Sequence, residues 1–154
     1  MQEVSAGASG TGIKGGEGMT ETASPFGEIL YGYFRSDALA DGILIEADPA
    51  MCKEAGIQIP AAITDHLWGV ISPDNLDDMP GQSINGRLWD LLWMFRIWVS
   101  DPKHRGQDRG RYKVIFLMKR PGCPARLEEF EVMVMCGPGD SGEPVLTFMF
   151  PEDD

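Results

Sequence analysis

The sequence predicts an α+β fold, in which short N-terminal helices and one central buried helix pack on a C-terminal antiparallel sheet of three to four strands. Two observations support this prediction. Helix-capping residues and helix-ending glycines are concentrated in the earlier part of the chain, whereas the last third contains an apolar run and two segments of alternating residues. Helices followed by strands, without regular alternation, are typical of α+β domains.

The 154 residues divide into three segments of different composition. Residues 1–25 are low-complexity and dominated by Gly, Ser, Ala, Thr and Glu, so they bury too little apolar area to offset the entropy of ordering. We therefore expect a disordered tail at residues 1–25, a single α+β domain at residues 26–151 and a short acidic tail at residues 152–154.

Two short helices are expected at the start of this domain. Ser36 is suited to cap a first helix that ends at Gly42, and Asp48 is suited to cap a second that ends at Gly56. Residues 43–45, which are Ile-Leu-Ile, read as a short strand between the two helices.

Two further helices are expected in the middle of the chain. Pro60 suits the first turn of a helix over residues 60–71. Residues 87–99 are the most apolar segment and lack internal Gly and Pro, so we expect a helix buried nearly all round. Arg87 and Asp90 are three residues apart at its start and are spaced to form an ion pair.

Three strands are expected in the last third. Residues 114–118 form a continuous apolar run, and residues 127–136 and 145–150 alternate with a period of two. The connecting segments are short and rich in Gly and Pro, which favours an antiparallel meander.

The charge distribution excludes some functional classes. The formal net charge is -11, which argues against a generally cationic nucleic-acid binder. Residues 101–120 are the exception, because seven basic and two acidic residues there form a basic loop of net charge +5. Apolar runs are shorter than the roughly 20 residues of a membrane span, and the three cysteines are too few and scattered for a disulfide framework. We therefore expect a cytoplasmic protein that contacts no membrane.

Three patterns suggest chemistry, and each has a simpler structural explanation. Residues 139–142 spell GDSG, as around the nucleophile of trypsin-like proteases, but glycines of this kind also form a hairpin turn, which we favour. The His and Cys residues show no metal-ligand spacing, so neither a metal nor a cofactor is expected. His66 follows Asp65 on a predicted helix, where adjacent side chains do not face each other.

Several motifs together resemble a known family. They include GRLWD-x-LWM over residues 86–94 and CGPGD-x-GEP over residues 136–144. The series, which extends from about Ile29 to Pro151, resembles a family of small, acidic, functionally uncharacterised proteins carried by bacterial plasmids and phages. The resemblance implies the setting of a mobile genetic element, where small acidic proteins often counter host defence.

We expect a non-catalytic interaction protein that inhibits a host defence system targeting nucleic acid, such as an anti-CRISPR or anti-restriction protein. Its partner would be a defence protein complex. The protein would use its own charged surface to bind the side of that complex that holds nucleic acid. The expected contact residues are charged and lie in three segments: Asp74, Asp77, Asp78, Glu128, Glu129, Glu131, Arg105, Arg109 and Arg111.

Two alternatives remain open at this stage. One is a small enzyme with an unrecognised site around His66, Asp90 and Asp140. The other is a nucleic-acid accessory protein that acts through the basic loop at residues 101–120.

Overall fold

The computed structural model describes residues 34–154, which form one compact unit. The tail expected at residues 1–25 and the apolar residues at positions 26–33 lie outside the described residues. In chain order the described elements are α2 (Arg35–Ala40), β2 (Leu44–Glu46), α3 (Pro49–Glu54), β3 (Ala61–Thr64), α4 (Asp65–Ile71), η1 (Leu76–Asp78), α5 (Ile84–Ser100), η2 (Pro102–His104), β4 (Arg109–Met118), β5 (Arg126–Pro138), β6 (Pro144–Met149) and η3 (Pro151–Asp153).

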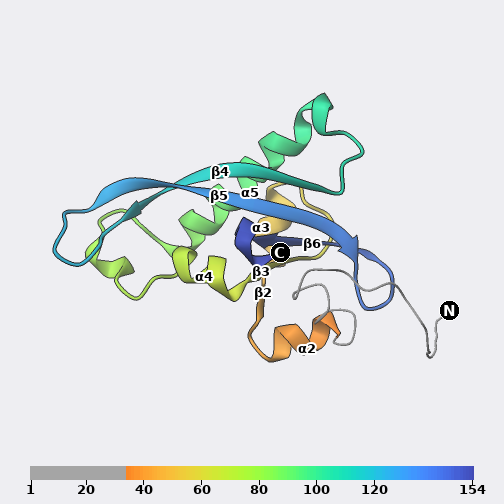
Figure 1. The fold of residues 1–154 in the computed structure, drawn as a ribbon, viewed down its shortest axis with the longest axis horizontal. Coiled ribbons are helices and arrows are strands. Elements are labelled where there is room, and N and C mark those ends of the chain that lie inside the picture. The colour runs from red at the N-terminus through yellow and green to blue at the C-terminus, as the bar shows by residue number, and fades with distance from the viewer. Residues whose placement is uncertain (1–33) are drawn as a thin grey trace. The chain divides into compact units, whose positions relative to one another are not determined.

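The architecture is α+β, built on a five-stranded mixed sheet with the order β2-β3-β6-β5-β4 (Figure 1). β4, β5 and β6 form the antiparallel meander that their alternation predicts. The expectation of three to four antiparallel strands is wrong in two respects, because β2 and β3 extend the sheet and β3 runs parallel to β6. None of the described helices is both long and apolar enough to span a membrane.

The helix predicted at residues 60–71 is only half helical. Its first part is β3, in which all four residues are buried between β2 and β6. Leu146 donates its backbone N–H to the Pro60 carbonyl at 2.8 Å, so pairing with β6 begins at this proline. The helix itself, α4, begins after Thr64, whose Oγ1 accepts the Leu67 N–H at 3.4 Å.

The two short early helices form where they are predicted. Asp48 caps α3, because its Oδ1 accepts the Ala50 N–H at 3.0 Å, and Gly56 ends the turn with φ of +87°. Ser36 does not cap α2, which begins one residue earlier. Its N-terminus is capped instead by Asp140, whose carboxylate accepts the N–H groups of Arg35 at 2.6 Å and Ser36 at 3.0 Å.

Helix α5 packs one face against the sheet. Tyr112 of β4 donates its hydroxyl to the Leu91 carbonyl at 2.8 Å. Phe95 meets Phe148 of β6 edge to face, with ring centroids 5.3 Å apart. Leu88, Leu91, Leu92 and Phe95 join the core. Figure 1 shows α5, in green, running behind β4 and β5.

The expectation of a helix buried all round is wrong, because α5 also has an apolar face that is open to solvent. The side chains most exposed on it are Trp93, Met94 and Ile97. Nor do Arg87 and Asp90 pair, since Arg87 turns into the core and donates to the carbonyls of Val70 and Leu117.

Candidate functional site

The outer face of α5 carries a stripe of large apolar side chains. Trp93 is 44% exposed, Met94 37% and Ile97 52%. Residues three and four apart lie next to each other on a helix, so these three side chains form one surface. Trp89, one turn before Trp93, stacks on it with ring centroids 5.7 Å apart. We call Trp89, Trp93, Met94 and Ile97 the α5 stripe.

One carboxylate lies within this stripe. Asp90 is exposed and stands three residues before Trp93 and four before Met94, so it shares their face. Partial desolvation raises the pKa of its carboxyl above the ordinary value. No hydrogen bond or ion pair joins this carboxylate to another side chain of residues 34–154, so it is available to a partner's cation.

The acidic loop ahead of α5 lies beside the first turns of the helix. Asp74, Asp77 and Asp78 are all exposed, as their sequence context predicts. The loop is anchored by Met79, which is buried and places its sulfur 3.7 Å from the Arg87 guanidinium. The anchor therefore ties the segment that carries these acids to the first turn of α5.

The remaining acidic contact candidates lie on β5, where they form ion pairs with basic residues of β4 and its turn. Glu131 is 3.8 Å from Arg111, and Glu129 is 3.7 Å from Lys113. Glu128 is 2.6 Å from Arg120, and this hydrogen bond holds the pKa of the Glu128 carboxyl below its ordinary value. The separate acidic strand and basic loop of the sequence prediction are thus largely one ladder of opposite charges.

The expectation of a basic loop over residues 101–120 is accordingly corrected. Its second half is strand β4, and its first half contains the single turn η2. Arg109 lies 3.4 Å from the Asp154 carboxylate. Arg105 is exposed and has no ion pair among the described residues, which makes it the least compensated of the predicted basic contacts.

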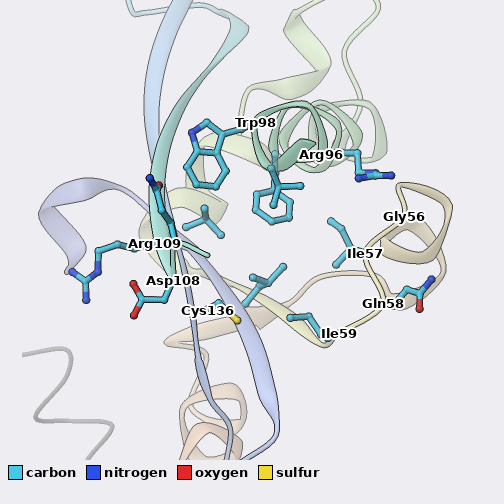
Figure 2. A pocket seen from close by; sticks show the side chains of 14 residues that line it. Gly56, Ile57, Gln58, Ile59, Arg96, Trp98, Asp108, Arg109 and Cys136 are labelled. Carbon is cyan, nitrogen blue, oxygen red and sulfur yellow. The ribbon is translucent and has the colours of Figure 1, made fainter. Parts of the chain in front are cut away.

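A hollow lies under the C-terminal half of α5, and sequence reasoning did not find it. Its volume is about 270 Å³. Figure 2 shows apolar side chains around it, with Arg96 beside Gly56 on one side and Asp108 and Arg109 on the other. The apolar lining comes from the segment after α3, from α5 and from strands β5 and β6: Ile57, Ile59, Phe95, Trp98, Val99, Val134 and Leu146.

Trp98 forms a fixed wall of this hollow. Its indole ring lies directly on Gly110 of β4, where a Cβ atom would collide with it. On another side it stacks with His104, with ring centroids 4.0 Å apart, and the His104 Nδ1 lies 2.7 Å from the Trp98 carbonyl oxygen. These contacts arise between residues on different elements, so no local sequence pattern signalled them.

His66 has an oriented carboxylate partner, but it is Asp153 rather than the adjacent Asp65. The His66 Nδ1 lies 3.0 Å from Asp153 Oδ1, and this hydrogen bond raises the pKa of the imidazole. Thr64 donates its hydroxyl to Asp153 Oδ2 at 3.0 Å, and Phe150 donates its N–H to the same oxygen at 3.1 Å. Glu152 and Asp153 of the expected acidic tail therefore belong to the turn η3, which Asp153 holds against the domain.

The GDSG motif forms the turn between β5 and β6. Strand pairing ends at Pro138 and Pro144, and Ser141 donates its backbone N–H to Glu143 Oε1 at 2.9 Å. Asp140 caps α2, as described above. His66, Asp90 and Asp140 thus have separate surroundings on α4, α5 and this turn, and no described contact brings them together.

Within residues 34–154, no group of three or more His, Cys, Asp or Glu side chains is placed to hold a metal ion. Comparison with curated proteins yields no match. Comparison with solved structures likewise yields none. A family model does match residues 23–154, nearly the whole chain, and the protein therefore belongs to the family of unknown function DUF6573.

Proposed function

We propose that the protein is a non-catalytic interaction protein of a mobile genetic element, which inhibits a host defence complex by covering its nucleic-acid-binding surface. The observation that supports this most directly is the exposed α5 stripe. Contiguous apolar surface on a folded domain marks interaction sites, and Trp and Met are enriched in the cores of protein interfaces.

The charge around the stripe indicates what kind of partner it fits. Asp90 stands on the same helix face as the stripe, and Asp74, Asp77 and Asp78 are exposed in the loop that precedes α5. The whole chain carries a net charge of -11. A protein surface that holds nucleic acid is cationic, because it must neutralise phosphates. Apolar anchoring by the stripe, combined with Asp90 on its face and the acidic loop before α5, is therefore complementary to such a surface.

The test measures binding of the tagged full-length chain to defence complexes captured from nuclease-treated host lysate and then purified. The double variant Trp93→Ser/Ile97→Ser removes the centre of the α5 stripe. Ile115→Ser/Leu127→Ser is the matched control, because these two side chains are also large, apolar and exposed, but lie on β4 and β5.

The stripe variant should lose affinity at least about tenfold, because anchor side chains at interface centres contribute most of the binding energy. The control should bind as the wild type does and should still inhibit cleavage of nucleic acid by the purified complex. Equal affinity of the stripe variant and the wild type, or capture of no nucleic-acid-targeting complex, would refute the proposal.

A second candidate function, a small enzyme, is favoured by one observation. His66 is half exposed, and its ring is oriented by an aspartate that is itself held by two further donors. This is the arrangement of a general base and its orienting carboxylate. If the chain is an enzyme of this kind, His66→Gln should abolish turnover of its substrate, whereas Trp93→Ser/Ile97→Ser should leave turnover unchanged.

The nucleic-acid accessory alternative has less support from the described residues. Arg111, Lys113 and Arg120, which belong to the predicted basic segment, each have a glutamate partner on β5. Cations that are already paired release fewer counterions when they bind phosphate. We therefore expect this segment to bind nucleic acid more weakly than its sequence suggests.

A further inference from the structure

We propose that the hollow beneath α5 is a binding site for a small apolar carboxylate, whose hydrocarbon body fills the hollow and whose carboxylate pairs with Arg96. This site is separate from the α5 stripe and does not depend on the function proposed above. Its lining residues face the sheet side of α5, whereas the stripe faces away from the sheet.

The size and lining of the hollow set the hydrocarbon part of the ligand. Its volume is about 270 Å³. An apolar cavity of about 150 Å³ in another protein holds benzene, so this hollow has room for a bicyclic ring or a short branched chain. Phe95 and Trp98 provide flat aromatic walls, and Val134 and Leu146 provide an aliphatic floor on the sheet.

The charges at the two ends of the hollow determine the polar group of the ligand and the end at which it binds. Arg96 lies across Gly56 at one end, and its guanidinium donates to Ser100 Oγ at 3.2 Å. It forms no ion pair with any described carboxylate. At the other end Arg109 is already paired with Asp154, and Asp108 presents a negative charge (Figure 2). A ligand anion is therefore attracted to the Arg96 end and repelled from the Asp108 end.

Two cysteines provide a direct reporter of occupancy. Cys136 lines the hollow, and Figure 2 shows its sulfur among the lining side chains. Cys123 lies in the turn between β4 and β5 and does not line the hollow. Both thiols are exposed, so both react with an alkylating reagent, and only Cys136 should be shielded by a ligand in the hollow.

The experiment measures the rate of iodoacetamide alkylation at each cysteine of the full-length chain by peptide mass spectrometry, while 1-naphthylacetate is titrated. Cys136 should become at least about fivefold slower at saturation, and Cys123 should be unaffected. The uncharged analogue 1-naphthylacetamide should need a concentration about tenfold higher, because the ion pair with Arg96 is replaced by a hydrogen bond to a neutral carbonyl. Arg96→Gln should weaken 1-naphthylacetate by a similar factor and leave the amide unchanged.

A variant in which a larger side chain fills the hollow provides the control. Val99 is 41% exposed at the edge of the hollow, so Val99→Trp should block the site without disturbing the core. Ile115→Trp is the matched change on β4, outside the hollow, and should leave protection intact. The proposal is overturned if Cys136 is not protected, if both cysteines are protected equally, if the amide protects as well as the carboxylate does, or if protection survives Val99→Trp.

Discussion

Arg87 is a buried cation that is held by neutral groups. Its side chain is 2% exposed, and its guanidinium donates to the carbonyls of Val70 and Leu117 and to Gln82 Oε1. The guanidinium also lies over the Phe116 ring, 5.2 Å from the centroid. Burial lowers the pKa of Arg87. The arginine therefore joins the end of α4, the start of α5 and the end of β4 through one side chain.

Replacement of Arg87 should destabilise the fold. Arg87→Met retains the apolar stem but leaves the Val70 and Leu117 carbonyls without their donor, so the free energy of unfolding should fall by about 2–4 kcal/mol. The measurement is urea unfolding followed by tryptophan fluorescence. Arg105→Met is the matched control, because Arg105 is exposed and unpaired in the described structure, and its effect should stay within about 0.5 kcal/mol. Equal stability of the two variants would contradict this role for Arg87.

The sequence misassigns Arg87 for a physical reason. Its spacing from Asp90 permits an ion pair on the helix surface. That pairing would expose the guanidinium, whereas the core offers it two carbonyls, an amide oxygen and an aromatic face from three other segments. Such a set of partners is assembled only by the tertiary fold, so a local pattern does not reveal it.

At the scale of elements, local capping is predictable and tertiary capping is not. Asp48 caps α3 from within two residues, and its position in the sequence predicts this. Asp140 caps α2 from the other end of the chain, so the helix start shifts from the predicted residue. β3 is missed for the same reason: Ala61–Thr64 becomes a strand because β2 and β6 supply hydrogen bonds on both sides.

The attachment of η3 should depend on pH through His66. Asp153 receives hydrogen bonds from His66, Thr64 and the Phe150 amide, and His66 also meets the Phe150 ring at 4.7 Å. The hydrogen bond with Asp153 raises the pKa of His66 in the folded state above its unfolded value. The stabilisation is therefore fully present below the unfolded pKa of about 6.5 and is lost as pH rises through the higher folded pKa.

The check is urea unfolding at about pH 6 and about pH 8.5, on either side of the imidazole titration. The wild type should lose more stability between these two values than His66→Gln, which keeps a hydrogen-bonding side chain but cannot titrate. Parallel pH profiles for the wild type and His66→Gln would show that this contact does not stabilise the fold.

For the whole molecule, the sheet order is the part that sequence reasoning could least supply. Alternation identifies β5 and β6 and their antiparallel meander with β4, because short turns join them. The parallel pairing of β3 with β6 joins residues such as Ala61 and Leu146, which are far apart in the sequence. The exposed α5 stripe follows from this arrangement, since the single sheet covers one side of a helix whose sequence is apolar on both.

The charge distribution predicts which acidic residues contribute most to binding of the target complex. The acids near α5 are unpaired in the described structure, whereas Glu129 and Glu131 are paired with Lys113 and Arg111. Charge reversal by Asp77→Lys/Asp78→Lys should therefore weaken binding to the target complex more than Glu129→Lys/Glu131→Lys, although both change the net charge equally. Titration calorimetry at low salt measures the difference.

The salt dependence of the affinity separates the electrostatic contribution of the acidic loop from the apolar contribution of the α5 stripe. Affinity of the wild type should fall as ionic strength rises from about 50 to about 300 mM, because salt screens the attraction between acidic loop and cationic target. Asp77→Lys/Asp78→Lys should flatten this dependence. Trp93→Ser/Ile97→Ser should lower affinity at every salt concentration and leave the slope unchanged, because burial of the α5 stripe is not an electrostatic contribution. A wild-type affinity that does not vary with salt would show that the acidic loop lies outside the interface.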